Sequence, residues 1–260
     1  MKLDFQTDGG VGTRANLGLI VLETDETMEP EFSRIMDRAG VALYHCRIAM
    51  APEIRPDTLM LMEKDLPASA RLLPPSLQFD AIGFGCTSAS TVIGSDKVAE
   101  AVRIACPGAK VTDPLAAVIA ACRALGVKRL GFVTPYIAEV SARMRSKLEE
   151  AGFEIAGFGS FEEGNDRVVA RITPASILQA IETVAAQEPC DAVFVSCTNL
   201  RCLDVIPIAE QTIGVPVISS NTALAWHMLR MAGVEDTTDR LGMLFAGPQE
   251  QEALTLQPVV

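Results

Sequence analysis

The sequence predicts an α/β protein made of two similar lobes related by a pseudo-twofold axis, with the active site between them. Three observations support this prediction. Apolar, strand-like runs alternate with helix-like segments along the whole chain. Segment 80–87 reads almost like segment 191–198, because each has an Asp, an apolar run, a small residue and then Cys-Thr. Two further pairs of segments match in the same order and at nearly the same offset.

These further pairs indicate an internal duplication. Residues 17–21 resemble residues 130–134, and residues 111–126 resemble residues 218–233. Two copies are too few for a solenoid, so a pair of lobes is the better interpretation. We expect residues 1–114 with 219–260 to form lobe 1 and residues 115–218 to form lobe 2.

The order of the elements predicts a parallel sheet flanked by helices in each lobe. Apolar runs bounded by Gly, Pro or Asp predict strands near residues 16–22, 41–49, 80–85, 109–112, 129–134, 154–159, 191–196, 215–218 and 241–245. The segments between them predict helices near residues 27–39, 57–72, 95–105, 114–125, 136–151, 174–187, 202–213 and 221–232. Asp113 and Asn221 are expected to cap helices that Gly126 and Gly233 end.

Composition and charge exclude several classes of function. The chain has 260 residues, 49% of them hydrophobic, which is enough for one large core or two ordinary ones. Its net charge of -11 argues against a nucleic-acid partner. The sequence has no apolar run long enough to span a membrane and no signal peptide at its start. We therefore expect a cytoplasmic protein that binds neither nucleic acid nor membrane and forms a homo-oligomer.

The sequence also has no motif for a metal or a nucleotide cofactor. Its seven cysteines form no CxxC pair and no Cys/His cluster with zinc spacing. An odd number of cysteines spread through core segments is typical of a reducing compartment. Neither a GxGxxG nor a GxxxxGK[ST] motif is present, so we expect an activity without cofactor or metal.

The two matched cysteines, Cys86 and Cys197, are the candidate catalytic residues. Each would lie just past the carboxyl end of a strand, where open α/β sheets place their ligands. The turns that follow carry Thr87 and Ser88 after the first cysteine and Thr198 and Asn199 after the second. Donors in such turns suit a carboxylate or enediolate oxygen and lower the pKa of a thiol.

Two thiols on opposite faces of a substrate favour cofactor-free isomerisation. One thiolate can remove a proton while the opposite thiol returns one, which racemises a carbon acid. The same pair can add a thiolate to an activated double bond, allow rotation and expel it. The structural alternative is that both cysteines are small buried hydrophobic residues, as most free cysteines are.

The motifs resemble a known family over about residues 17–243. The two Cys-Thr motifs, Thr134-Pro135-Tyr136 and segment 214–221 are similar to the maleate cis-trans isomerase and arylmalonate decarboxylase group of the aspartate/glutamate racemase superfamily. This resemblance implies that Cys86 and Cys197 form the catalytic pair and that Tyr136 binds a substrate carboxylate.

Departures from that family pattern narrow the expected chemistry. Decarboxylases of the group typically keep only the second thiol, so the presence of both favours an isomerase or racemase. Glutamate racemases usually carry His where Asn199 stands. Maleate isomerases have an Asn in the loop after the first strand that binds substrate, whereas this chain has Asp25 there, beside Thr24. A carboxylate at this place repels simple dicarboxylates and attracts an amino or amidino group.

The loop around Asp25 resembles most closely the branch associated with ectoine utilisation. Ectoine carries a carboxylate and a cationic amidine, which agrees with the charge argument. The leading hypothesis is an isomerase or racemase of a small carboxylate. The alternatives are a decarboxylase or lyase that uses mainly Cys197, or a non-catalytic small-molecule binding protein. Either Asn165 or Asp166 could reach the site from its polar loop, although a solvated loop is an equal interpretation.

Overall fold

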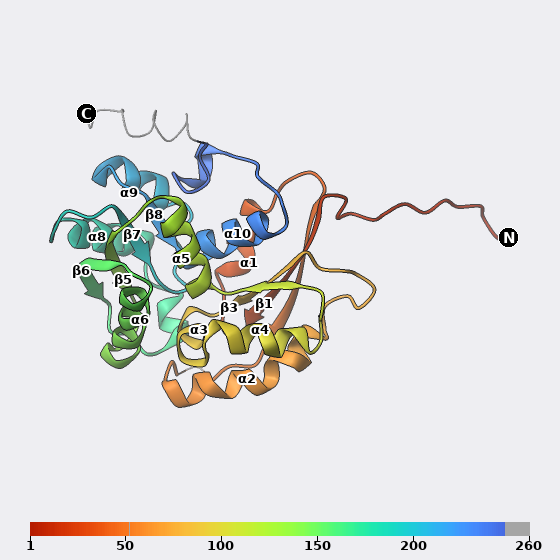
Figure 1. Cartoon of the computed structure of the whole chain (residues 1–260), viewed down its shortest axis with the longest axis horizontal. Coiled ribbons are helices and arrows are strands. Elements are labelled where there is room, and N and C mark those ends of the chain that lie inside the picture. The colour runs from red at the N-terminus through yellow and green to blue at the C-terminus, as the bar shows by residue number, and fades with distance from the viewer. Residues whose placement is uncertain (52, 248–260) are drawn as a thin grey trace.

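The computed structural model describes residues 1–51 and 53–247 and contains two parallel four-stranded sheets. The first sheet has the order β2-β1-β3-β4, and the second has the matching order β6-β5-β7-β8. Figure 1 shows the two sheets side by side, with helices around each. The predicted fold class is therefore confirmed.

The strands follow the predicted runs closely. They are β1 (Ala15–Leu22), β2 (Val41–Ile48), β3 (Ala81–Gly85), β4 (Lys110–Thr112), β5 (Arg129–Thr134), β6 (Glu154–Ser160), β7 (Ala192–Val195) and β8 (Val217–Ser219). Strands β1, β3, β5, β7 and β8 are buried for most of their length. Strands β2, β4 and β6 also contain partly or fully exposed residues. Strands buried on both faces read as continuous apolar runs, and this pattern made them recognisable in the sequence.

The helices cover the faces of the two sheets (Figure 1). They are α1 (Met28–Ile35), α2 (Pro56–Ala70), α3 (Thr87–Ile93), α4 (Ser95–Arg103), α5 (Pro114–Ala124), α6 (Ala138–Glu150), α7 (Asp166–Val169), α8 (Pro174–Ala185), α9 (Ile206–Ile213), α10 (Ser220–Met231) and the 3-10 turn η1 (Asp239–Leu241). Helix α10 packs against β3 and α5, and α8 packs against β5 and β6. The lobe boundaries at residues 114 and 219 stay a prediction.

The caps of α5 and α10 differ from each other. Asp113 caps α5 as predicted, because its Oδ1 accepts the amides of Leu115 and Ala116 at 2.9 and 3.1 Å. The prediction for Asn221 is wrong, since Ser219 caps α10 and accepts the Thr222 amide at 3.1 Å. The Asn221 side chain is thereby free for contacts in the site. Gly126 and Gly233 follow their helices with φ of 71° and 75°, a left-handed conformation that favours glycine.

The expected strand at residues 241–245 is also wrong. This segment forms η1 and a series of turns, in which the Thr238 amide donates to the Phe245 carbonyl at 2.9 Å. The Met243 amide donates to both carboxylate oxygens of Glu210, at 3.1 and 3.0 Å. A side chain thus satisfies the backbone amide that a neighbouring strand would otherwise bind.

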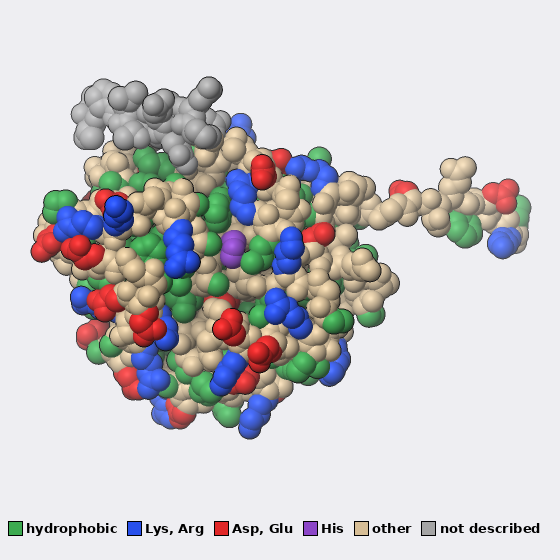
Figure 2. Space-filling model, viewed as in Figure 1, with side chains coloured by type: hydrophobic (Ala, Val, Ile, Leu, Met, Phe, Trp, Pro, Cys, Tyr) green, Lys and Arg blue, Asp and Glu red, His purple; other side chains and the backbone are tan. Residues whose placement is uncertain are grey.

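The outer surface mixes both signs of charge. Figure 2 shows acidic and basic side chains interspersed over the visible face. The N-terminal segment extends away from the body (Figure 1) and exposes Leu3 and Phe5. Across residues 1–51 and 53–247, every helix is too short or too polar to cross a membrane.

Gly157 in β6 allows a close approach between the second sheet and α8. A Cβ atom at this position would lie 2.5 Å from the Val184 carbonyl oxygen, which is backbone and cannot move aside cheaply. We predict that Gly157→Ala lowers the free energy of unfolding by about 1–3 kcal/mol in urea titrations. Gly108→Ala is the control, because nothing lies within 4 Å of the added methyl group. Equal stability of the two variants would contradict this packing.

Candidate active site

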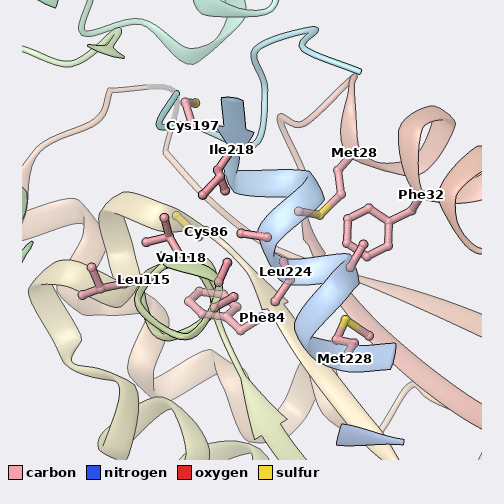
Figure 3. Packing of buried hydrophobic residues seen from close by; sticks show 14 of the residues in the cluster. Met28, Phe32, Phe84, Cys86, Leu115, Val118, Cys197, Ile218, Leu224 and Met228 are labelled. Atoms are coloured by element: carbon pink, nitrogen blue, oxygen red, sulfur yellow. The ribbon is translucent and has the colours of Figure 1, made fainter. Parts of the chain in front are cut away.

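The two predicted catalytic cysteines occupy equivalent places in the two sheets. Cys86 follows β3 and Cys197 follows β7 after one residue, and each of these strands is third in the order of its sheet. Figure 3 shows Cys86 among the packed side chains of the core, with Ile218 drawn between it and Cys197 in this view. Both cysteines are buried, with 2% and 4% of each residue exposed. Both thiols are therefore shielded from water in this structure.

Ser220 joins the segments that carry the two thiols. Its hydroxyl oxygen accepts the Cys197 amide at 3.0 Å and the hydroxyl of Thr87, the residue after Cys86, at 2.8 Å. The two thiols also have charged neighbours in common: burial raises the pKa of both cysteines most, and the charges of Asp25 and Asp166 raise it further. Burial likewise raises the pKa of Tyr136, and charges on both sulfurs add to this effect.

Cys86 lies at the start of α3 and caps that helix. Its Sγ accepts the Ala89 amide at 3.4 Å and lies 3.6 Å from the Ser88 hydroxyl. Burial nevertheless raises its pKa to about 12, although the hydrogen bonds from Ser88 and Ala89 lower it. The donors of the turn thus lower the thiol pKa as expected, but burial outweighs them.

Cys197 has an unusual backbone conformation. Its φ of 109° lies in a region that residues other than glycine rarely adopt. Its amide donates to the Ser220 hydroxyl oxygen at 3.0 Å, and Thr87 donates to the same oxygen at 2.8 Å. Burial raises the Cys197 pKa well above its ordinary value, while a hydrogen bond from Tyr136 lowers it. The surroundings thus impose a conformation that the residue would not choose alone.

Hydrogen bonds join the loop after β7 to the first sheet. Asn199 Oδ1 accepts the Glu26 amide at 2.9 Å, and its carbonyl accepts the Thr27 hydroxyl at 3.0 Å. Thr198 donates to the Gly85 carbonyl at 3.5 Å. The side chains of Thr198 and Asn199 thus hold the loops together, and their expected role in binding substrate stays a prediction.

A buried carboxylate, Glu31 of α1, supports the loop that carries Cys197. Its Oε1 accepts the amides of Cys202 and Leu203 at 2.8 and 2.9 Å, and its Oε2 accepts Asn221 Nδ2 at 2.8 Å. Asn221 Nδ2 also donates to the Thr198 carbonyl at 2.8 Å. Burial raises the Glu31 pKa to about 7. The sequence analysis did not identify this residue as part of the site.

The loop after β1 brings Asp25 and Thr24 to the site. Asp25 is 2% exposed, and its Oδ1 accepts the amides of Thr27 and Met28 at 2.8 and 2.7 Å. Its Oδ2 is buried without a hydrogen-bond partner, although the nearby Thr198 hydroxyl lowers its pKa. Burial raises this pKa to about 6.

Of the two candidates in the polar loop, Asp166 is the one beside the thiols. Its Oδ2 accepts the Thr24 hydroxyl at 2.5 Å, and its carbonyl accepts Asn199 Nδ2 at 3.2 Å. Asn165 instead caps the short helix α7, where its side chain accepts the Arg167 amide at 3.0 Å. Periodicity does not separate two adjacent polar residues, so the sequence left this choice open.

Comparison with known proteins agrees with this arrangement. A sequence model of the arylmalonate decarboxylase family matches residues 106–245, more than half of the chain. The chain belongs to the arylmalonate decarboxylase family. It is 34% identical over 127 residues to the arylmalonate decarboxylase of Bordetella bronchiseptica, which covers 48% of this chain and 53% of that one. It is 25% identical over 224 residues to the maleate isomerase of Nocardia farcinica, covering 82% of this chain and 88% of the relative.

Solved structures of maleate isomerases share the fold of this protein over most of its length. The isomerase of Pseudomonas putida with maleate superposes with a TM-score of 0.82 at 23% identity, over 90% of this chain and 98% of that one. A cysteine-to-serine mutant of the Nocardia farcinica enzyme, with a covalently bound succinylcysteine intermediate, gives a TM-score of 0.80 at 23% identity, over 89% and 98%. The family thus comprises enzymes, one of which forms a covalent bond through cysteine.

The raised pKa of Glu31 predicts an unusual dependence of stability on pH. The folded protein keeps a proton on Glu31 up to about pH 7, whereas the unfolded chain releases it near its ordinary pKa of 4.5. Glu31 therefore lowers stability as pH rises through this window, by about 1.4 kcal/mol per unit of pKa difference. We predict that Glu31→Gln removes this contribution, so the stability of the wild type relative to the variant falls from about pH 5 to about pH 8.

Urea titrations of both proteins across this pH range measure the difference. Asp25 and Glu210 also have raised pKa values, but they are present in both proteins and cancel in the comparison. A difference in stability that stays constant with pH would show that Glu31 does not titrate in this window.

Proposed function

We propose that this protein is a cofactor-independent isomerase or racemase that acts on a small carboxylate through Cys86 and Cys197. The observation that carries the proposal is that two buried thiols follow equivalent strands and share the neighbours Asp25, Tyr136 and Asp166. A decarboxylase needs only one proton donor on one face of its intermediate. A second thiol in the same site has a use when a substrate must be approached from two faces.

The chemistry needs one sulfur as thiolate and the other as thiol. In racemisation, the thiolate accepts the proton of the substrate carbon, and the opposite thiol delivers its own proton to the other face. In cis-trans isomerisation, the thiolate adds to the double bond, the new single bond rotates, and the sulfur leaves again. We expect Tyr136, which lowers the pKa of Cys197 against the larger effect of burial, to bind a substrate carboxylate beside that sulfur.

The charge of the site favours a substrate with a cationic group. None of the ion pairs formed by residues 1–51 and 53–247 includes Asp25, Glu31 or Asp166. A second substrate carboxylate at ~4 Å from one of them meets a repulsion of ~4 kcal/mol at an effective dielectric of ~20. We therefore propose an amino- or amidino-bearing carboxylate. Ectoine has this combination, and a role in ectoine degradation is our specific hypothesis.

A decarboxylase that uses mainly Cys197 is the second candidate. The family match at residues 106–245 includes Cys197 but not Cys86. Loss of carbon dioxide and racemisation share an enediolate intermediate, so the same loops serve either reaction. The third candidate is a small-molecule binding protein without catalytic activity. Such a protein would not need reactive thiols.

The proposal also covers the cofactor, the oligomeric state and the cellular compartment. We propose that the enzyme needs no metal or organic cofactor, forms a homo-oligomer and works in the cytoplasm. The support for a reducing compartment is that all seven cysteines are free thiols.

We predict that Cys86→Ser and Cys197→Ser each abolish interconversion of the substrate isomers while the far-ultraviolet circular dichroism stays unchanged. Serine keeps the size of the side chain but is a far weaker acid and nucleophile than a thiol. Exchange of the substrate proton with solvent deuterium, followed by nuclear magnetic resonance, shows which face each thiol serves. Cys122→Ser, on a buried cysteine of α5, is the control. Full activity in both site variants would reject the catalytic role.

We predict that Asp25→Asn weakens binding of the native substrate and strengthens binding of maleate-like dicarboxylates. The variant keeps the side-chain oxygen that accepts the Thr27 and Met28 amides, but removes the negative charge. The change corresponds to about 1.5–3 kcal/mol for a charged hydrogen bond, or about one to two decades in Kd. Calorimetry at low salt measures both affinities. Unchanged dicarboxylate binding would show that Asp25 does not face the substrate.

A further inference from the structure

Two carboxylates, Asp25 and Asp166, lie beside the reacting thiols without a cation to balance them. Asp25 comes from the loop after β1, and Asp166 comes from the start of α7. Each is 2% exposed, and the charge of Asp166 acts on Asp25. The guanidinium of Arg47, on β2, donates to the Asp25 backbone carbonyl at 3.1 Å and pairs with Glu29. Both carboxylates thus lack an ion-pair partner.

The unpaired oxygen of Asp25 marks a place where a donor is missing. Oδ1 accepts two backbone amides, whereas Oδ2 is buried and makes no direct hydrogen bond among the described residues, although the nearby Thr198 hydroxyl lowers the pKa of this carboxyl. A buried carboxylate oxygen without a direct donor is costly, and a bound ligand is one way to satisfy it. On Asp166, the Thr24 hydroxyl donates to Oδ2 at 2.5 Å; burial raises the pKa of this carboxyl, and the hydrogen bonds from Thr24 and Asn199 lower it. A planar cation with several N–H groups matches two such acceptors.

The same two charges act on the sulfurs. Each of them raises the pKa of both cysteines, in addition to the larger effect of burial. The other titratable groups around the sulfurs include Tyr136, Glu31 beside Asp25, and Cys202, whose pKa is raised by burial and also by Glu31 and Cys197. Glu26 acts on Asp166 and pairs with Arg171. A cation between the carboxylates therefore removes an electrostatic obstacle to thiolate formation.

We propose that Asp25 and Asp166 bind the amidinium or ammonium group of the substrate, and that this binding brings one of the two adjacent thiols into the thiolate form. The inference rests on the function proposed above and adds the second carboxylate and the trigger for reactivity. In the step itself, one S–H bond breaks, the sulfur keeps the electron pair, and the proton leaves to solvent as the cation enters. The net charge of the closed site is thereby conserved. Without the cation, the enzyme keeps its thiols neutral and protected from alkylation and oxidation.

The test uses acetamidinium as the probe, with neutral acetamide as its matched control. Binding to the full chain is followed by the ultraviolet absorbance of the thiolate, and proton release is measured by calorimetry in two buffers of different ionisation enthalpy. We expect acetamidinium to give a saturable thiolate signal with proton release, and acetamide to give neither. Cys86→Ser and Cys197→Ser identify which sulfur ionises.

Substitutions of Asp25 and Asp166 test whether these carboxylates cause the acetamidinium binding and the thiolate signal. Asp166→Asn is expected to weaken acetamidinium binding on the order of tenfold, and the double variant with Asp25→Asn to lose the thiolate signal. Asp65→Asn, on the exposed side of α2, is the control that should behave as wild type. Because Asp25 also accepts amides at the start of α1, circular dichroism checks that each variant folds. If the double variant does not fold, the comparison of acetamidinium binding by Asp166→Asn and by the wild type decides the test.

Each outcome decides between the inference and the proposed function. Binding of acetamidinium without thiolate formation, or equal binding by wild type and Asp166→Asn, overturns the inference. If Cys86→Ser and Cys197→Ser stay fully active while acetamidinium binding still depends on Asp166, the two-thiol function falls and the cation subsite stands. If both cysteines prove essential but acetamidinium has no effect, the function stands and the inference falls.

Discussion

The carboxylate of Glu31 lies where three segments of the chain meet, and the position of Cys197 depends on it. It accepts two backbone amides from the loop after β7 and the side-chain amide of Asn221 at the start of α10. Asn221 in turn holds the Thr198 carbonyl, one residue after the strained Cys197. Burial raises the pKa of Glu31 to about 7, and the three accepted hydrogen bonds lower it without offsetting the burial. Glu31 thus fixes one thiol relative to the first sheet.

Burial governs the chemistry of the site as strongly as it governs the fold. A closed site of low dielectric raises the pKa values of Cys86, Asp25 and Glu31 together, because each prefers its neutral form there. In the proposed mechanism, a substrate that brings its own positive charge changes this balance, since it stabilises the carboxylates and a thiolate at once. Selection of the substrate and activation of the thiol would then depend on the same charge.

The sequence predicted the two sheets and the equivalent positions of the two cysteines because both depend on local patterns. Buried parallel strands are continuous apolar runs, and duplication repeated the motif that ends in Cys86 and Cys197. The helix α3 escaped detection, because Thr87-Ser88-Ala89-Ser90 reads as a turn unless Cys86 is recognised as its cap. The role of Glu31 was not accessible either. Its acidic neighbourhood is typical of a helix N-terminus, and its partners are amides more than 170 positions away in the chain.

The residues that stayed ambiguous are those whose role depends on three-dimensional proximity. Asn165 and Asp166 are adjacent and equally polar, and only the fold shows that one caps α7 while the other lies beside the thiols. Asn221 was expected to cap α10, but Ser219 takes that place, and the Asn221 side chain bridges Glu31 and Thr198 instead. Local sequence identifies residues able to bind, whereas packing decides what they bind.

The central claim is that Cys86 and Cys197 lie on opposite faces of one bound substrate. A crystal structure of the Cys86→Ser variant with a small amino-carboxylate tests it most directly. The account predicts electron density for the ligand between the hydroxyl oxygen that replaces the Cys86 sulfur and Cys197 Sγ, with the cationic end of the ligand toward Asp25 and Asp166. A ligand bound outside this space, or two side-chain positions that open into separate cavities, would contradict the account.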